Sequence, residues 1–321
     1  MRHMYSQVKL QQGDRVALIA PSGSIASAER VDYAVEYFKK LGLIPVEGAN
    51  CRNIYGHLAG TDDQRAADFN WAFADESIKA VFCIRGGNGA AKILDKINFE
   101  QIKKNPKCFY GYSDISVLHA AINQKTGLIT YHTPMASEPN FAEADAYTLA
   151  QFEQYIFEPR RTGPIETPDD WTPDVLNTTF LKATPGGQPP QFLNKGTAEG
   201  LLCGGNLAAI SGTMGTPYEI DTRGKIFFIE EVGQRPPHID RRLNAFKLAG
   251  KFDECAGVIF GGFTNCKASD KYSLDIPTII HNLGLKVPVI WNFPCGHDLP
   301  TASLPLGAKV RMDSKIGVLV L

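Results

Sequence analysis

A short apolar run near the start of the chain reads Arg15-Val-Ala-Leu-Ile-Ala-Pro21. An unbroken apolar run of this length is typical of a parallel strand that is buried on both faces of a sheet. The segment Ser22-Gly-Ser24 ends the run, and a helical pattern follows to about Leu41. A strand that passes through a glycine-containing turn into a helix is the repeating unit of open α/β sheets.

The same alternation continues through the first half of the chain. We expect further strands at 43–46, 79–85, 107–112 and 128–132, and helices at 61–74, 90–97 and 115–124. Thr61 and Gln64 have the spacing of a capping box, which marks a helix start. Strands and helices that alternate with short connections predict a Rossmann-like parallel sheet with helices on both faces.

The second half of the chain predicts another α/β domain. A helix at 146–157 precedes a stretch from 158 to 195 that is rich in proline, threonine, glycine and aspartate, as in a linker or surface loop. Beyond it we expect a helix at 239–248 and strands at 200–203, 226–229, 256–260, 288–292, 309–312 and 317–321. The predicted organisation is therefore a domain at 1–140, a linker or loop region at 141–195 and a C-terminal domain at 196–321.

Composition excludes several classes of protein. The chain has 321 residues, of which 44% are hydrophobic, so a largely disordered protein is excluded. Lys and Arg number 33 against 34 Asp and Glu, a balance that argues against nucleic acid or a membrane surface as partner. No apolar run approaches the roughly 20 residues that span a bilayer.

The start of the chain and the cysteines predict a cytoplasmic protein. Residues 1–15 are polar and lack the apolar core of a secretory signal. The seven cysteines are an odd number, are widely spaced and include no Cys-x-x-Cys pair. This pattern predicts buried free thiols in a reducing compartment rather than disulfides or a zinc site.

The candidate catalytic and binding residues lie directly after predicted strands, at the strand ends where open parallel sheets bind ligands. Ser113 follows the strand at 107–112 as the serine of a nucleophile elbow would, although Ile115 stands where the usual elbow has glycine. The alternative is that Ser113 is a helix N-cap. The segment Arg85-Gly-Gly-Asn-Gly89 could offer backbone N–H groups to a phosphate or an oxyanion, or could be only a tight turn.

A histidine and a pair of glutamates complete the candidate set. His297 lies in a glycine- and proline-rich loop, where histidines are often functional, and the alternative is a surface histidine. Glu230 and Glu231 could orient a histidine or form an exposed acidic pair. We expect His119 and His281 to be structural and keep His57 and His132 as weaker candidates. No cluster has metal-ligand spacing.

Together these residues supply the parts of a Ser–His–carboxylate triad with a glycine turn for the oxyanion. A binding or sensor domain without catalysis is a second hypothesis, and it predicts that Ser113 caps a helix. A dinucleotide-dependent oxidoreductase is a third, which the absence of Gly-x-Gly-x-x-Gly disfavours.

Six short segments occur along the chain in the same order as in a known protein family, and together they are more specific than any one motif. They are Gly13-Asp-Arg-Val-Ala-Leu-Ile-Ala-Pro-Ser-Gly23, Arg85-Gly-Gly-Asn-Gly89, Tyr110-Gly-Tyr-Ser-Asp114, Gly204-Gly-Asn-Leu207, Ile229-Glu-Glu231 and Gly296-His297. The chain resembles the LD-carboxypeptidase family of serine peptidases, which includes murein tetrapeptide carboxypeptidases and microcin C immunity peptidases. The resemblance runs from about residue 10 to the C-terminus, except over 140–195.

The resemblance implies a Rossmann-like N-terminal domain and a C-terminal swivelling α/β-β domain, with a site between them and commonly a homodimer. It implies a triad of Ser113 as nucleophile, Glu230 as carboxylate and His297 as base, with Glu231 as the alternative carboxylate. The oxyanion hole resembles the backbone N–H groups of Gly87 and Asp114. No metal or organic cofactor is implied.

Two features concern the substrate. Many members of the family carry an aromatic residue where this chain has Asn88, and Arg85 is a candidate cation for a terminal carboxylate or a structural brace. The implied substrate is a murein-derived tetrapeptide, cut before its terminal D-alanine during cell-wall recycling. The alternative is a peptidyl- or aminoacyl-nucleotide, for which Trp171 and Phe180 in the 158–195 stretch could stack on a base.

Overall fold

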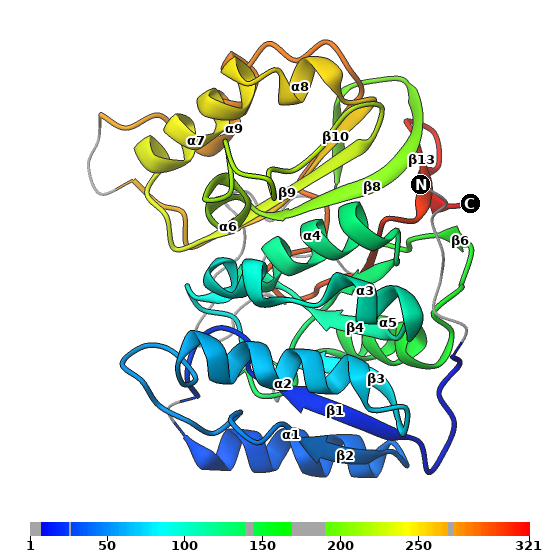
Figure 1. The fold of residues 1–321 in the computed structure, drawn as a ribbon. Coiled ribbons are helices and arrows are strands. Elements are labelled where there is room, and N and C mark those ends of the chain that lie inside the picture. The colour runs from blue at the N-terminus through cyan, green and yellow to red at the C-terminus, as the bar shows by residue number, and fades with distance from the viewer. Residues whose placement is uncertain (1–7, 26, 139–140, 142–143, 169–189, 269–271) are drawn as a thin grey trace. The chain divides into compact units, whose positions relative to one another are not determined.

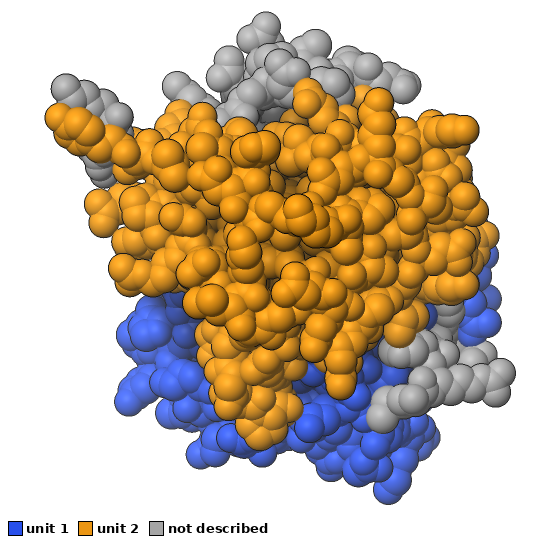
Figure 2. All heavy atoms as spheres, turned by 90° about the horizontal axis from the view of Figure 1, so that it is seen from above, with its two compact units in different colours: residues 1–143, 152–160, 303–307 blue, residues 144–151, 161–302, 308–321 orange. Residues whose placement is uncertain are grey.

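The computed structural model describes residues 8–25, 27–138, 141, 144–168, 190–268 and 272–321. The chain forms two compact units that alternate along the sequence (Figure 2). Unit 1 comprises residues 1–143, 152–160 and 303–307, and unit 2 comprises residues 144–151, 161–302 and 308–321. None of the helices described here is long and apolar enough to cross a membrane.

Unit 1 contains a six-stranded sheet in the order β12-β5-β4-β3-β1-β2 (Figure 1). Strands β1 to β5 are parallel, and β12 is antiparallel to β5. Their bounds are Arg15–Ile19 for β1, Ile44–Glu47 for β2, Ile78–Cys83 for β3, Cys108–Gly111 for β4, Thr130–His132 for β5 and Leu304–Leu306 for β12. The predicted parallel sheet is confirmed, and its order reverses between β1 and β3, the position at which such sheets commonly bind ligands.

The helices of unit 1 follow the predicted alternation. They are α1 (Ala28–Lys40), α2 (Asp62–Ala74), α3 (Phe99–Lys104), α4 (Ser116–Thr126) and two 3-10 helices, η1 (Ala90–Lys96) and η2 (Ser113–Ile115). The capping box of α2 is present: Thr61 Oγ1 accepts from the Gln64 N–H, and Gln64 Oε1 accepts from the Thr61 N–H. Helix α5 (Ala146–Phe157) has the predicted bounds. The sheet forms the core because the residues of β1 from Val16 onward are fully buried.

Unit 2 contains a mixed eight-stranded sheet in the order β6-β14-β13-β8-β9-β10-β11-β7. Its four central strands are parallel: β8 (Thr197–Asn206), β9 (Ile226–Val232), β10 (Gly257–Thr264) and β11 (Val289–Trp291). Antiparallel strands flank them: β13 (Lys309–Asp313), β14 (Gly317–Val320), β6 (Gly163–Pro164) and β7 (Gln191–Asn194). The predicted second α/β domain is thus confirmed as a fold.

Helices cover one face of the unit 2 sheet around a single apolar cluster (Figure 1). They are α7 (Pro236–Leu248), α8 (Lys251–Glu254) and α9 (Ile276–Asn282), with the short α6 (Leu207–Ser211) after β8. Phe246, Phe252 and Ile279 pack from these helices against Phe227 and Phe260 of the strands. A buried cluster of this kind is the main stabilising element of a layered α/β unit.

The structure corrects three details of the predicted elements. Strand β9 continues through Glu230 and Glu231, and β10 continues through Gly261 and Gly262, where strand ends were predicted. The stretch 158–195 begins and ends with short edge strands, β6 and β7. Trp171 and Phe180 lie outside the described residues. The predicted boundaries near 140 and 195 stay a prediction.

Candidate active site

Ser113 lies on a strained turn directly after β4. Its φ is +62°, in the left-handed region that residues other than glycine seldom adopt. It is not a helix N-cap, since Tyr112 and Ile115 occupy the N-cap positions of η2 and α4. The N-cap alternative is therefore wrong, and the geometry is that of a sharp strand-to-helix turn that presents a hydroxyl.

A glycine turn packs directly against Ser113. A Cβ placed on Gly86 would lie 2.9 Å from the Ser113 Cβ and 3.0 Å from its Oγ, so only glycine fits there. Gly87 has a φ of +139°, and a Cβ on it would lie 2.8 Å from the Gly23 nitrogen. The Gly23 N–H donates to the Gly86 carbonyl at 2.9 Å. The loops after β1, β3 and β4 thus meet around the Ser113 hydroxyl.

The Asp114 side chain ties the same loops together. Its Oδ2 accepts from the Ser22 hydroxyl at 2.5 Å and from the N–H groups of Gly89 and Ala90, each at 2.8 Å. The Arg85 guanidinium donates to the Ser24 carbonyl and so braces the loop after β1. Sequence reasoning named Asp114 only for its backbone N–H and missed Ser22, whose position after a buried strand was the available signal.

Unit 2 contains a buried glutamate–histidine pair. His297 Nδ1 lies 2.8 Å from Glu230 Oε2, and the Glu230 side chain is fully buried whereas His297 is 12% exposed. A carboxylate at Nδ1 holds that nitrogen protonated and leaves Nε2 as the basic nitrogen of the ring. The pair therefore has the geometry of a general base and the group that orients it.

Glu231 has a different environment from Glu230. Its carboxylate accepts from the N–H groups of Ala208 and Val232, each at 2.9 Å, and from the Asn206 side chain at 3.2 Å. Adjacent residues of a strand point to opposite faces, so only one of the two glutamates reaches His297. Burial, assisted by the charge of Glu230, raises the pKa of Glu231 to about 7.

Glycines allow the loop that carries His297 to lie on β10. A Cβ on Gly261 would lie 2.2 Å from the Cys295 carbonyl oxygen, and one on Gly296 would lie 3.3 Å from Glu230 Oε2. The Gly262 N–H donates to the Cys295 carbonyl at 2.9 Å. The glycine pair inside β10 therefore has a clear role: it lets the loop approach closely enough for His297 to contact Glu230.

A second buried carboxyl lies beside this pair. Asp298 is 5% exposed, and burial raises its pKa to about 7. The Thr264 hydroxyl is near enough to lower that pKa, although neither Asp298 oxygen has a hydrogen bond of normal geometry within the described residues. Asp298 thus adds a second buried carboxyl with a raised pKa directly after the histidine in sequence, and the sequence analysis did not single it out.

The other histidines lie elsewhere in the structure. His119 is fully buried in α4 with Nε2 2.9 Å from the Gly111 carbonyl oxygen, and burial lowers its pKa to about 4. A neutral, buried histidine that supports the turn before Ser113 fits the predicted structural role. His281 ends α9 and His57 lies on an exposed loop. His132 is buried at the end of β5.

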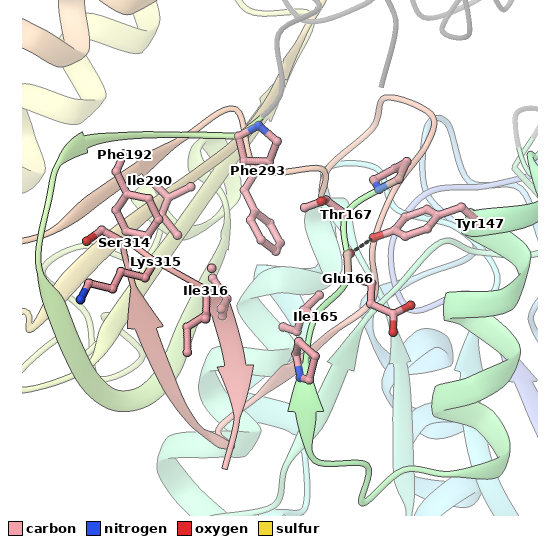
Figure 3. Close-up of a pocket in the computed structure, with 15 residues that line it drawn as sticks. Tyr147, Ile165, Glu166, Thr167, Phe192, Ile290, Phe293, Ser314, Lys315 and Ile316 are labelled. Atoms are coloured by element: carbon pink, nitrogen blue, oxygen red, sulfur yellow. Dashed lines mark hydrogen bonds between the residues drawn. The ribbon is translucent and has the colours of Figure 1, made fainter. Parts of the chain in front are cut away.

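A cavity of about 750 Å³ opens within unit 2 (Figure 3). Phe192 of β7, Ile290 of β11 and Phe293 form an apolar wall, and Lys315 and Glu166 place opposite charges around it. The Tyr147 hydroxyl donates to the Glu166 carbonyl at 2.5 Å. None of the predicted site residues lines this cavity, so its size alone does not identify the place of the chemistry.

The predicted residues thus form two groups. Ser113, Gly87, Asp114 and Arg85 belong to unit 1, and Glu230 and His297 belong to unit 2. In unit 1 the glycine turn packs against Ser113, and in unit 2 His297 contacts Glu230. Residues 16–133 match the family model described as the LD-carboxypeptidase N-terminal domain, and residues 199–312 match that of the C-terminal domain. The chain belongs to the LD-carboxypeptidase family.

Individual family members agree with this assignment. The chain is 38% identical to the probable murein peptide carboxypeptidase of Bacillus subtilis, over 97% of this chain and 92% of the relative. It is 28% identical to the murein tetrapeptide carboxypeptidase of Pseudomonas aeruginosa, over 93% of each chain. Among solved structures, MccF in complex with glutamyl sulfamoyl guanosine matches with a TM-score of 0.85 and 25% identity, over 98% of this chain and 97% of the other.

Proposed function

We propose that this chain is a serine LD-carboxypeptidase that releases the terminal D-alanine of murein tetrapeptide, with Ser113 as nucleophile, His297 as general base and Glu230 as the orienting carboxylate. The single observation that carries the proposal is the buried contact of 2.8 Å between Glu230 and His297. The strained turn at Ser113 and the names of the murein-specific relatives support it.

In the proposed acylation step, His297 Nε2 takes the hydroxyl proton while Ser113 Oγ attacks the carbonyl carbon before D-alanine. Backbone N–H groups of Gly87 and Asp114 stabilise the oxyanion, and one such donor contributes about 2.7–4 kcal/mol. The carbon–nitrogen bond then breaks, His297 gives its proton to the departing amine, and an ester to Ser113 remains.

In the deacylation step, water adds to the ester carbonyl and gives its proton to His297. The carbon–oxygen bond to Ser113 breaks, the serine recovers its proton, and a shortened peptide with a free carboxylate leaves. Glu230 keeps its negative charge throughout and stabilises the imidazolium in both steps. No step requires a metal or an organic cofactor.

Arg85 is the candidate residue for binding the terminal carboxylate of the substrate. It follows β3 at the start of the glycine turn and is partly exposed. Its bond to the Ser24 carbonyl involves one guanidinium nitrogen, and a guanidinium has several donors. We therefore propose that Arg85 braces the loop after β1 and faces the substrate terminus from the same position.

A second substrate class has its own support. The similarity to MccF bound to glutamyl sulfamoyl guanosine covers nearly the whole chain, so a peptidyl- or aminoacyl-nucleotide is the alternative substrate. The same nucleophile and base would serve, because an acyl group is transferred to serine in both reactions.

The cellular setting is also part of the proposal. All seven cysteines are buried and none forms a disulfide, as expected in a reducing compartment. We propose a cytoplasmic homodimeric enzyme of cell-wall recycling.

The test is D-alanine release from L-Ala-D-Glu-meso-diaminopimelyl-D-Ala, measured for the wild type and for Ser113→Ala. Release by the wild type alone is the expected result. Equal release by both proteins would refute the role of Ser113. Release by neither, together with Ser113-dependent cleavage of an aminoacyl-sulphamoyl nucleotide, would refute the murein substrate and leave the second class.

A further inference from the structure

Two buried charged side chains of unit 1 converge on the segment that contains the glycine turn. Asp114 binds the N–H groups of Gly89 and Ala90, each at 2.8 Å. Arg65, on helix α2, donates to the Gly89 carbonyl and to the Pro21 carbonyl, each at 2.7 Å. Gly89 is therefore held at both its N–H and its carbonyl by groups from two other elements.

Burying a charged side chain costs free energy unless hydrogen bonds or an ion pair replace its contacts with water. Asp114 is 8% exposed and Arg65 is 1% exposed. Each satisfies its charge mainly with backbone groups of neighbouring loops, apart from the ion pair between Arg65 and the partly exposed Asp62. Hydrogen bonds to ionised groups are roughly twice as strong as neutral ones, so these contacts fix the loops firmly.

The loops that they hold surround the nucleophile. Ser22, which donates to Asp114 at 2.5 Å, and Pro21 belong to the loop after β1, against which the Gly86–Gly87 turn packs. Asp114 itself follows Ser113. One carboxylate and one guanidinium thus connect the ends of β1, β3 and β4, the three strands that meet at the turn.

We propose that the side chains of Asp114 and Arg65 have a positioning role: they hold the Gly87 backbone N–H in line with Ser113, and so shape the oxyanion hole without themselves touching the substrate. The proposal rests on the assignment of Ser113 as nucleophile. A change of about 1 Å in such an element costs on the order of 100-fold in rate, because the donor no longer meets the oxyanion.

The experiment measures the rate at which a fluorophosphonate labels the protein. In this reaction the Ser113 Oγ–phosphorus bond forms, the phosphorus–fluorine bond breaks, and fluoride leaves as His297 takes the proton. The phosphoryl oxygen needs the same donors as a peptide oxyanion, so the readout does not depend on the natural substrate. The variants are Asp114→Ala, Asp114→Asn, Arg65→Met and Ser22→Ala.

Asp68→Asn is the matched control. Asp68 is a carboxylate of helix α2 with 5% exposure that likewise accepts from a backbone N–H, that of Asn50 at 2.9 Å, but the loop it holds is the one after β2 and not the loops around Ser113. We expect Asp114→Ala and Arg65→Met to label on the order of 100-fold more slowly. Ser22→Ala removes one of the three hydrogen bonds that Asp114 Oδ2 accepts, so its labelling rate should fall a few-fold. Asp114→Asn should label faster than Asp114→Ala but more slowly than the wild type. Asp68→Asn should label at the wild-type rate.

Kinetics on the peptide substrate distinguish positioning from general damage. Rates are divided by the fraction of protein molecules that the fluorophosphonate labels at completion. We expect kcat to fall in parallel with the labelling rate while KM stays within about twofold of the wild-type value. Asp114→Ala and Arg65→Met proteins that fold and label at the wild-type rate would overturn the proposal. If either variant does not fold, wild-type rates for both Ser22→Ala and Asp114→Asn would overturn it.

The labelling of Ser113→Ala separates this inference from the proposed function. An unlabelled Ser113→Ala protein supports the nucleophile whatever the other variants do. Labelling of Ser113→Ala at the wild-type rate, or no labelling of the wild type, would refute the nucleophile and the positioning role with it.

Discussion

Replacing Glu230 by glutamine tests the part of the site on which the mechanism depends most. The change keeps the shape of the side chain and removes its charge. The carboxylate lies 2.8 Å from His297 Nδ1 and is fully buried, and His297 is only 12% exposed, so water screens the pair weakly. At an effective dielectric constant of about 20, two unit charges at this separation interact by about 6 kcal/mol.

That energy sets the expected loss of activity. The imidazolium forms only as the serine proton moves, so the lost attraction acts on the transition state and not on the resting enzyme. About 6 kcal/mol corresponds to about four orders of magnitude in kcat, with little change in KM. Glutamine can also donate to Nδ1, which would hold the proton on Nε2 and remove the base.

The assay is D-alanine release over a range of substrate concentrations, and Glu231→Gln is the control. Glu231 holds the start of α6 through the Ala208 N–H, so we expect its variant to lose stability but less than tenfold in kcat. Wild-type activity of Glu230→Gln would contradict the argument, as would a larger loss of kcat in Glu231→Gln.

Two further predictions concern residues around the site. Gly86→Ala should reduce kcat by about 100-fold or more, because the new Cβ would lie 2.9 Å from the Ser113 Cβ and displace the turn. The circular dichroism spectrum should stay unchanged. Wild-type activity of this variant would show that the turn can shift without loss of catalysis. Asp298→Asn should flatten the pH dependence of stability. The folded-state pKa of Asp298 is about 7 against an unfolded value near 4, so the folded protein retains a proton that the unfolded chain loses, and the free energy of unfolding falls as pH rises between these values. The fall is at most about 4 kcal/mol, and urea unfolding at pH 5 and pH 8 should show less of it in the variant; identical pH dependence would rule out Asp298 as its source.

The sequence predicts the parallel sheets well for a physical reason. Strands β1, β3 and β9 are buried on both faces, and this burial demands the apolar runs that mark them. Strand β12 was missed because Leu304-Pro-Leu306 is short, contains proline and finds its partner β5 far away in the sequence. Such pairing leaves no local pattern.

The sequence indicates which residues are candidates for the site, but it does not show which of them contact one another. Period-two alternation indicates that Glu230 and Glu231 face opposite ways, but only the fold shows which of them contacts His297. The two glutamates resembled a strand end because charged residues are seldom buried in the middle of a strand. Arg65 was not singled out in the sequence, because charged residues of helices are mostly exposed, whereas its side chain is buried.

Strand β12 also has a consequence for how the protein is made. It completes the edge of the unit 1 sheet, yet it comes from residues 303–307, after nearly all of unit 2 in chain order. During synthesis the first five strands of unit 1 leave the ribosome long before their sixth, so the edge of β5 has to wait for the last part of the message to be translated. Exposed strand edges are prone to pair with other chains. A truncated product that stops before residue 303 would therefore be a candidate for aggregation or chaperone capture, even though the turn that carries Ser113 has already been translated.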